Sequence, residues 1–280
     1  MWVFILISLL CSGSTLSAKI QTPQKKSVFI FPKDETPLNK NAPIRIVGGQ
    51  EANAHQFPYQ VGLYVTYAMN QAFCGGSLIS QNYVLTAAHC AEGAVSMQVI
   101  LGAHNISDTS ESSRQTQTSA TFIVHPSWDS STLTNDVALV KLTTPAELNS
   151  YVQIIQLASG SNSYANNQGI ATGWGKTIDS QSSVTDILRY ETNTIMNNEQ
   201  CKATDSDYAS VIKDTHLCQS GEGIRGICKG DSGGPLVTNG VQVGITSFSY
   251  KSCEAGKPSV FTRITSFSDW ITNNSDVTFL

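Results

Sequence analysis

A long series of short, strand-like runs constrains the fold of this chain more than any other feature. The first six runs are QVGLYVTY (60–67), GGSLIS (75–80), YVLTAA (83–88), MQVILGAH (97–104), TSATFIVH (118–125) and DVALVKL (136–142). Four more follow: GIATGWG (169–175), LRYETNTIM (188–196), PLVTNGVQVGITSF (235–248) and SVFTRI (259–264). Apolar residues recur in them with a period of two rather than 3.6, which is typical of strands. The chain, with 40% apolar residues, is predicted to be a globular all-β protein.

Short strands separated by glycine-rich turns indicate either a sandwich or barrels, and the pattern alone does not distinguish them. The residues after position 45 are numerous enough for two small barrels packed together. Asn239-Gly240 lies between apolar runs and predicts a hairpin with a type I′ turn. Only the C-terminal end looks helical, because Phe267, Trp270 and Ile271 have the spacing i, i+3, i+4, with Thr265 and Ser266 as expected caps.

The first 17 residues form a short apolar run followed by small residues, the pattern of a secretory signal peptide. We expect residues 1–18 to be removed near Ser17 or Ala18, and the protein to be secreted and extracellular. The alternative, a membrane anchor, is disfavoured because spanning a bilayer takes about 20 apolar residues.

The cysteines agree with export. Without Cys11 of the signal, an even set remains: Cys74, Cys90, Cys201, Cys218, Cys228 and Cys253. Such a set suits disulfides in an oxidising compartment, although spacing alone leaves the pairing open. Sequons at Asn105 and Asn273 permit N-glycosylation.

Charge divides unevenly along the chain. Residues 19–45 hold six Lys or Arg against two acidic residues, whereas residues 46–280 hold 11 basic against 19 acidic residues. An acidic body argues against nucleic acid or an anionic membrane as a partner, since these require a basic face. The basic leader is rich in Lys, Pro and Asn and lacks periodicity, so we interpret it as a flexible, solvated propeptide rather than a docked segment.

Three short stretches carry the chemistry: LTAAHC (85–90), NDVAL (135–139) and KGDSGGP (229–235). Singly, each has a structural explanation, namely a core histidine, a turn cap and a tight glycine loop. Together they supply a serine hydroxyl, an imidazole to accept its proton and a carboxylate to orient the imidazole. The glycines beside Ser232 allow backbone N–H groups to converge on an oxyanion, and we expect a side chain at Gly230 to obstruct the approach of substrate.

The order His, Asp, Ser separates this chain from subtilisins and α/β-hydrolases. With IVGG at 46, AAHC, NDVAL, TGWG at 172–175 and GDSGGP at 230–235, residues 46–280 resemble the trypsin/chymotrypsin family of serine endopeptidases. The stretches LGAHNI (101–106), GITSF (244–248) and CEAGKP (253–258) resemble the brachyurins, a chymotrypsin-like group of arthropod digestive proteases.

This resemblance implies a fold of two packed six-stranded antiparallel barrels, about residues 46–155 and 156–265, with a C-terminal helix at about 266–275. It also implies that His89 is the general base and acid, Asp136 its orienting partner and Ser232 the nucleophile. The N–H groups of Gly230 and Ser232 would form the oxyanion hole. The implied disulfides are Cys74–Cys90, Cys201–Cys218 and Cys228–Cys253.

In this family a cleaved amino terminus inserts beside the carboxylate that precedes the nucleophile. The resemblance therefore implies that cleavage after Arg45 frees the amino group of Ile46, which pairs with Asp231 and orders the site. The activating enzyme would be a trypsin-like protease. Residues 19–45 contain no cysteine, so the propeptide should leave after cleavage and is not a clip domain.

The residue six before the nucleophile lies at the base of the family's primary pocket, and here it is Gly226 rather than an acid. The other expected pocket residues are Lys229 at the rim, Ser247, Phe248, Ser249 and Ser259. Brachyurins that accept basic residues have an acid at the position of Ser259. We therefore expect preference for apolar or aromatic residues before the scissile bond.

Two other functions remain open: a cascade protease with one protein substrate, and a non-catalytic binding homologue. The first usually has regulatory modules and an acidic pocket base, and the second requires a broken triad. No cofactor or metal is expected, since Ala103 after Gly102 begins a loop without clustered carboxylates. Expected partners are protein or peptide substrates and protein inhibitors, and the chain is expected to be a monomer.

Overall fold

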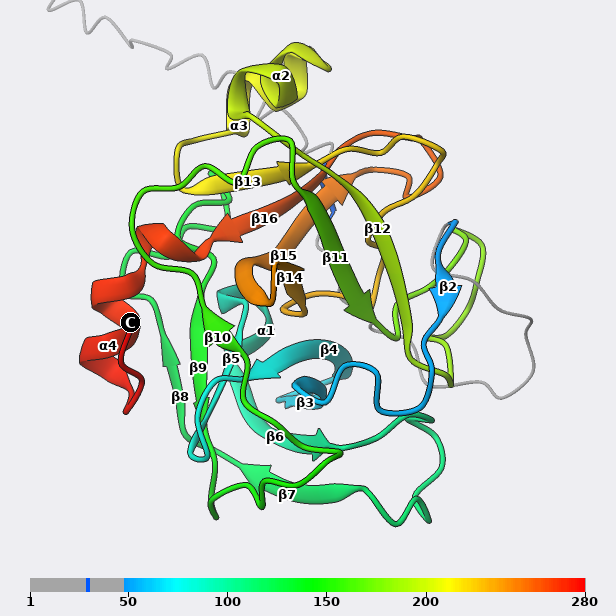
Figure 1. The fold of residues 1–280 in the computed structure, drawn as a ribbon, viewed down its shortest axis with the longest axis vertical. Coiled ribbons are helices and arrows are strands. Elements are labelled where there is room, and N and C mark those ends of the chain that lie inside the picture. Colours follow the sequence, from blue (N-terminus) through cyan, green and yellow to red (C-terminus); the bar gives the residue numbers. More distant parts are fainter. Residues whose placement is uncertain (1–28, 31–47, 280) are drawn as a thin grey trace, which may run out of the picture.

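The computed structural model describes residues 29–30 and 48–279. The predicted signal peptide, Arg45 and Ile46 lie outside these residues. Two curled, mainly antiparallel sheets, one above the other in Figure 1, form the body of the molecule.

The first sheet has the order β7-β6-β3-β4-β5-β9-β8. Its strands are β3 (Gln60–Tyr67), β4 (Gln71–Leu78), β5 (Tyr83–Thr86), β6 (Ala94–Leu101), β7 (Gln115–Ser119), β8 (Phe122–Val124) and β9 (Ala138–Lys141). β7 and β8 are separated by only two residues and pair with β6 and β9, respectively. The sheet therefore curls round on itself, with buried side chains such as Val61, Leu63 and Leu139 inside it.

The second sheet contains a closed barrel of six strands. These are β11 (Gln168–Gly173), β12 (Arg189–Met196), β13 (His216–Gln219), β14 (Pro235–Thr238), β15 (Val241–Tyr250) and β16 (Ser259–Arg263). They follow the order β15-β14-β11-β12-β13-β16, and β16 pairs back with β15. The predicted chymotrypsin-like all-β fold is confirmed, with one difference: the second sheet closes into a six-stranded barrel, whereas the first is a curled sheet of seven strands whose edge strands do not pair with each other in the described residues. Two short strands join this sheet, β2 (Gln50–Glu51) beside β12 and β10 (Gln156–Leu157) beside β15.

The hairpin prediction at Asn239-Gly240 is confirmed. β14 and β15 pair on either side of it, and both turn residues have positive φ, 50° and 79°. This is the backbone geometry that a type I′ turn requires.

The prediction that only the C-terminal end is helical is wrong. Besides α1 (Ala88–Ala91) and α4 (Ser268–Asn274), the structure has α2 (Asn198–Ala203) and α3 (Ser206–Val211). Six residues are too few for an apolar period to show. The missed signal is the capping box of Asn197 and Gln200. The predicted caps of α4 also differ, because a 3-10 turn (η1, Ile264–Ser266) precedes the helix and its N-cap is Phe267.

Part of the leader also departs from expectation. Strand β1 (Phe29–Ile30) pairs with the end of β15, Phe29 opposite Tyr250 and Ile30 opposite Ser249. These two β15 residues lie beyond its ladders with β14 and β16, and an unpaired strand edge readily accepts another strand. For these two residues the interpretation as a solvated segment is wrong.

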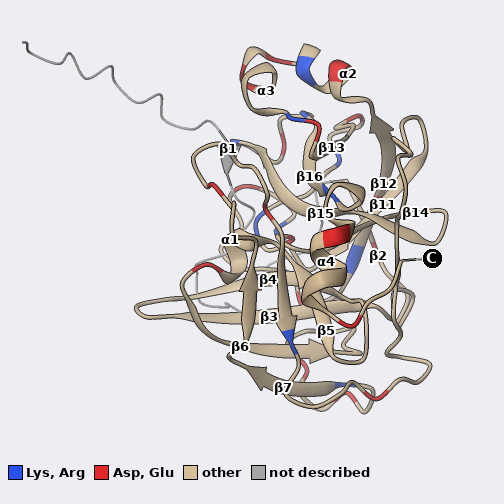
Figure 2. Ribbon diagram, turned by 90° about the vertical axis from the view of Figure 1, so that its left-hand side faces the viewer, with Lys and Arg blue, Asp and Glu red and all other residues tan. Residues whose placement is uncertain are grey.

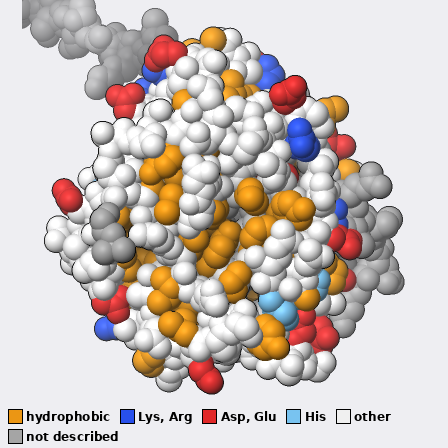
Figure 3. All heavy atoms as spheres, viewed as in Figure 1, with side chains coloured by type: hydrophobic (Ala, Val, Ile, Leu, Met, Phe, Trp, Pro, Cys, Tyr) orange, Lys and Arg blue, Asp and Glu red, His pale blue; other side chains and the backbone are white. Residues whose placement is uncertain are grey.

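Charged groups are interspersed over the described surface. Figure 2 shows Lys and Arg mingled with Asp and Glu, and on the face seen in Figure 3 the charged side chains lie mostly around the edge, with apolar groups across the middle. Among the described residues, no helix has both the length and the apolar character to cross a membrane.

Candidate active site

Loops at the junction of the two sheets carry the three catalytic candidates. His89 lies in α1, directly after β5, and Asp136 precedes β9. Ser232 lies in the turn before β14 of the second sheet. In Figure 1, α1 occupies the middle of the molecule, between the two sheets. The first sheet thus positions the imidazole and the carboxylate, and the second positions the hydroxyl.

The structure brings these three side chains into one hydrogen-bonded line. His89 Nδ1 lies 2.7 Å from Asp136 Oδ2, and His89 Nε2 lies 2.5 Å from Ser232 Oγ. The backbone N–H of His89 also donates to Asp136 Oδ1, at 2.9 Å. An imidazole held between a carboxylate and a hydroxyl can accept the hydroxyl proton and pass it on.

Asp136 is a buried carboxylate whose oxygens are well supplied with donors. Ser247 Oγ donates to Oδ2 at 2.5 Å, in addition to the two contacts from His89. Burial opposes ionisation, but the charge and hydrogen bonds of His89, with the hydroxyl of Ser247, hold the pKa of Asp136 below its ordinary value. Ser247, expected in the substrate pocket, thus directs its side chain to Asp136.

The N–H groups of Gly230 and Ser232 are available to a ligand. In residues 48–279, neither N–H donates to another group of the chain. Gly230 has φ of 99°, and a Cβ there would lie 2.5 Å from Val184 Cγ1 and 3.1 Å from Gly175 Cα. A side chain at Gly230 would therefore collide with the segment that connects β11 and β12, a reason for this glycine in addition to the expected obstruction of substrate.

Asp231, next to the nucleophile, is a second buried carboxylate. The N–H of Gly175 donates to Oδ1 at 2.8 Å, and the N–H of Cys228 donates to Oδ2 at 2.9 Å. Within the described residues it has no cationic partner. Burial raises its pKa to about 7, against the effect of the two N–H donors.

The TGWG motif has a physical role that the sequence did not disclose. A Cβ at Gly173 or Gly175 would overlap the carboxyl group of Asp231. The two glycines therefore leave room for this side chain beneath the loop that bears Ser232.

The hydroxyl group of Ser259 lies at the expected pocket base. A Cβ at Gly226 would lie 2.6 Å from Ser259 Oγ, which accepts a hydrogen bond from Ile227 N at 3.1 Å. Ser249 lies on β15, whereas the Phe248 side chain packs edge-on against His216, with ring centroids 5.5 Å apart. Glu254, an acid that could have entered from nearby in sequence, is instead exposed and accepts from Asp179 N.

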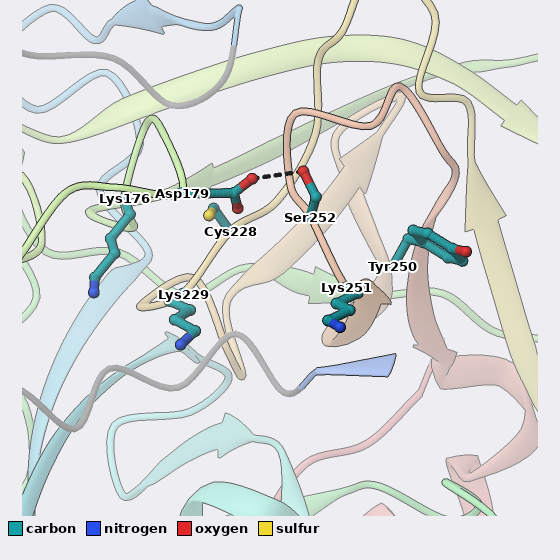
Figure 4. A pocket seen from close by; sticks show the side chains of 7 residues that line it. All are labelled: Lys176, Asp179, Cys228, Lys229, Tyr250, Lys251 and Ser252. Atoms are coloured by element: carbon teal, nitrogen blue, oxygen red, sulfur yellow. Dashed lines mark hydrogen bonds between the residues drawn. The ribbon is translucent and has the colours of Figure 1, made fainter. Parts of the chain in front are cut away.

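Lysines surround the mouth of a neighbouring cavity of about 540 Å³. Figure 4 shows its lining residues: Lys176, Asp179, Cys228, Lys229, Tyr250, Lys251 and Ser252. The only acid among them, Asp179, accepts from Ser252 Oγ and from the N–H of Cys253. Lys229 and Lys251 are exposed, so the rim presents positive charge on a largely acidic protein.

The described residues contain three disulfides: Cys74–Cys90, Cys201–Cys218 and Cys228–Cys253. These are the pairs that the family resemblance implied. The first ties β4 to the helix that bears His89. The third joins the segment before Ser232 to the segment after β15.

Within the described residues, one group of side chains has the spacing of a metal site, Asp179 with Cys228 and Cys253. The two sulfurs are bonded to each other, so they cannot act as thiolate ligands. Of the two sequons, Asn273 is exposed, whereas the Asn105 side chain accepts a hydrogen bond from Ser107 N.

One further buried acid, Glu191 on β12, could not be recognised from the sequence. Its strand, RYETNTIM, has polar residues on both faces, and the alternation did not reveal which face is buried. In the structure, the face with Arg189, Glu191, Asn193 and Ile195 points inward.

Comparison with known proteins gives a consistent result. The trypsin family matches residues 46–271. A chymotrypsin from Phaedon cochleariae is 36% identical over 277 residues, 97% of each protein. Brachyurin from Leptuca pugilator is 40% identical over 234 residues, 83% of this chain and 100% of that protein. A trypsin from Sus scrofa is 39% identical over 228 residues, 81% and 94% of the two proteins. A solved structure described as HL collagenase is 35% identical and superposes with a TM-score of 0.76, covering 84% of this chain and 100% of its own.

Proposed function

This chain belongs to the trypsin family and is a chymotrypsin-like serine endopeptidase, and from that premise we propose that His89, Asp136 and Ser232 are its catalytic residues. The observation that carries the proposal is the pair of contacts made by His89, 2.7 Å to Asp136 Oδ2 and 2.5 Å to Ser232 Oγ. The enzyme's substrates are proteins and peptides, in which it hydrolyses peptide bonds.

The reaction proceeds in two halves. Ser232 Oγ attacks the carbonyl carbon of the scissile bond while His89 Nε2 takes the hydroxyl proton, and the N–H groups of Gly230 and Ser232 hold the oxyanion. His89 then gives the proton to the leaving amine, the C–N bond breaks and an acyl-enzyme remains. Water attacks the acyl group in the same way, which releases the acid and restores Ser232. Asp136 stabilises the imidazolium in both halves.

The nucleophile is tested by labelling and by kinetics. An irreversible serine-directed phosphonate should modify the activated wild type at one site and leave Ser232→Ala unmodified. Hydrolysis of peptide esters should fall by several orders of magnitude in this variant, because the triad acts as a unit. Full activity in a correctly folded Ser232→Ala protein would refute the assignment.

We further propose that the protein is made as a secreted zymogen, with a signal peptide at 1–18, a propeptide at 19–45 and the peptidase domain at 46–280. The apolar run at the amino terminus and the three disulfides support export. Cleavage after Arg45 by a trypsin-like protease would supply the positive charge that Asp231 lacks within the described residues. The absence of an acid at Gly226, the expected pocket base, favours a digestive role, by analogy with the brachyurins, over the alternative of a cascade protease with one substrate.

Activation is tested by treating the zymogen with trypsin. Activity should begin together with a new amino terminus, Ile46-Val47-Gly48-Gly49, and Arg45→Gln should stay inactive under the same treatment. Trypsin-treated Arg45→Gln with full activity would refute cleavage at this bond.

The relatives include chymotrypsin and trypsins at similar identity, so specificity has to be argued from the pocket. Gly226 has no side chain, and Ser249 and Ser259 offer hydroxyl groups and no carboxylate. Burying Lys or Arg there without a partner is penalised by several kcal/mol. We therefore propose preference for apolar residues before the scissile bond, broad among Phe, Tyr, Leu and Met because one methylene changes binding by only about 1–3 kcal/mol.

The exposed ammonium groups of Lys229 and Lys251 add a second element of specificity. They should favour acidic side chains at positions flanking the scissile bond, because opposite charges across a partly open rim attract weakly but measurably. We expect a several-fold gain in kcat/KM at low salt that 0.5 M NaCl removes.

A peptide library digested by the activated enzyme tests both statements. The products should end mainly in apolar residues, with acidic residues enriched nearby, and Lys251→Gln should reduce that enrichment. Exposed Lys213→Gln, in another loop, is the matched control. Dominant cleavage after Lys or Arg would overturn the pocket assignment and leave the catalytic residues untouched.

A further inference from the structure

Glu191 is buried without an ordinary hydrogen bond to its carboxyl group. Its relative exposure is 2%, and neither carboxyl oxygen accepts a hydrogen bond of ordinary geometry in the part of the chain that the structure describes, although the Gln219 side chain lies close enough to lower its pKa. Burying a polar group unpaired costs free energy. The residue therefore calls for an explanation beyond packing.

The surroundings of Glu191 connect it to Asp231. Both residues line one small pocket, with Ala171, Thr172, Gly226 and Ile227. This pocket shares Gly226 with the proposed substrate pocket, but Ser249 and Ser259 are not among its lining residues, so the two pockets adjoin at Gly226.

Few charged groups face this carboxyl. They are Asp231 and the guanidinium of Arg225, while Arg189, on the same face of β12, is bound to Glu51 Oε1 and to Gly49 O, both at 3.1 Å. Burial raises the pKa of Glu191 to about 8. Arg225 and Gln219 act against this rise, and Asp231 adds to it. The pair of acids thus lies in a region short of positive charge.

The start of the mature chain runs towards this pair. β2 is antiparallel to β12, with Glu51 opposite Arg189 and Gln50 opposite Tyr190, so the chain enters β2 from the side of Glu191, the next residue of β12. Gly48 lies against Arg225 and Ile224, next to the pocket residues Gly226 and Ile227. Two extended residues span at most about 7 Å, so the amino group of Ile46 can reach no further than that from Gly48.

We propose that Glu191 is a positioning residue for activation: with Asp231, it receives the α-ammonium group that cleavage after Arg45 creates. The new amino terminus is then held by two carboxyl groups instead of one. The inference rests on the proposed activation at Arg45. It gives a role to an acid that lies on the buried face of β12 without an ordinary hydrogen bond to its carboxyl oxygens.

The alkaline limb of activity tests this proposal. The cleaved enzyme loses its ordered site when the ammonium group deprotonates, so kcat/KM should fall at high pH. Removing an opposite charge close to the ammonium should lower the midpoint of that fall by about one pH unit in Glu191→Gln. Exposed Glu222→Gln is the control and should leave the midpoint unchanged.

A second readout reports the amino group itself. At one pH within the limb, acetic anhydride should modify Ile46 several-fold faster in cleaved Glu191→Gln than in the wild type, as measured by mass spectrometry. If the glutamine variant does not fold, Glu191→Asp serves, because it keeps the charge with a shorter reach and should shift the midpoint by a smaller amount.

These experiments distinguish a failure of the activation scheme from a failure of the role of Glu191 alone. A wild type without an alkaline limb, or an uncut chain as active as the cleaved one, would overturn the activation scheme and this inference with it. A normal limb that Glu191→Gln leaves in place, with an unchanged rate of modification at Ile46, would overturn the role of Glu191 alone.

Discussion

Asp136 and Asp231 are both fully buried carboxylates beside the same catalytic serine, yet their surroundings move their pKa values in opposite directions. Asp136 receives hydrogen bonds from His89 and Ser247, and its pKa is lowered. Asp231 receives two backbone N–H groups, has Glu191 as an acidic neighbour, and its pKa is raised to about 7. The first acid has its complete set of partners within the folded chain, whereas the second lacks a cation among the described residues.

This contrast indicates what each region does. A complete environment keeps Asp136 ionised and fixed, as an orienting group in catalysis must be. An incomplete one makes the conformation around Asp231 dependent on a charge that arrives later, which is the requirement for a switch. The two regions adjoin at Ser232: its side chain contacts His89, the partner of Asp136, and its backbone is bonded directly to Asp231.

Asp136 and its hydrogen-bond partners are called the complete site here, and Asp231 with its surroundings the incomplete site. Replacing Asp136 should have the largest effect on activity. Asp136→Asn places an amide among groups that already donate, which favours the wrong imidazole tautomer. We expect kcat/KM for a chromogenic peptide to fall about 10⁴-fold, with little change in thermal unfolding. A loss under tenfold would show that this carboxylate does not orient His89.

The same substitution in the incomplete site should cost less activity and affect a different step. Asp231→Asn leaves the inserted ammonium group without its main partner, a change worth about 3–5 kcal/mol, or roughly 10²–10⁴-fold in the fraction of ordered enzyme. In cleaved protein, active-site titration should count fewer competent molecules. A variant with a full titre and only slower turnover would contradict the switch.

The sequence predicted the complete site much better than the incomplete one. His89, Asp136 and Ser232 occur in motifs whose residue types are dictated by the reaction. The strands also followed from alternation, because runs such as 60–67 have one clearly apolar face. Glu191 gave no such signal, since both faces of β12 are mixed. The role of Gly173 and Gly175, which is to leave room for the Asp231 carboxyl, depends on contacts between residues far apart in the chain and could not be predicted from the motif.

Removing one peripheral donor from the complete site should have a smaller effect. Ser247→Ala deletes the hydroxyl that donates to Asp136 Oδ2 but leaves both contacts from His89. A hydrogen bond to a charged group contributes about 1.5–3 kcal/mol, so kcat/KM should fall about tenfold or somewhat more. Unchanged kinetics would limit the complete site to the two contacts from His89.

The central claim is that the region of Asp231 and Glu191 is destabilised until cleavage supplies a cation, and thermal unfolding against pH tests it directly. Folded pKa values of about 7 and about 8 lie above the ordinary values of 3.8 and 4.5. Stability from these groups is therefore fully present below about pH 4 and is lost as the pH rises to about 8. For uncut Arg45→Gln we expect Tm to decrease by at least about 4 °C between pH 5 and pH 8, equivalent to roughly 1 kcal/mol or more. The cleaved wild type should show a much flatter curve over the same interval, and parallel curves for the two proteins would contradict the account.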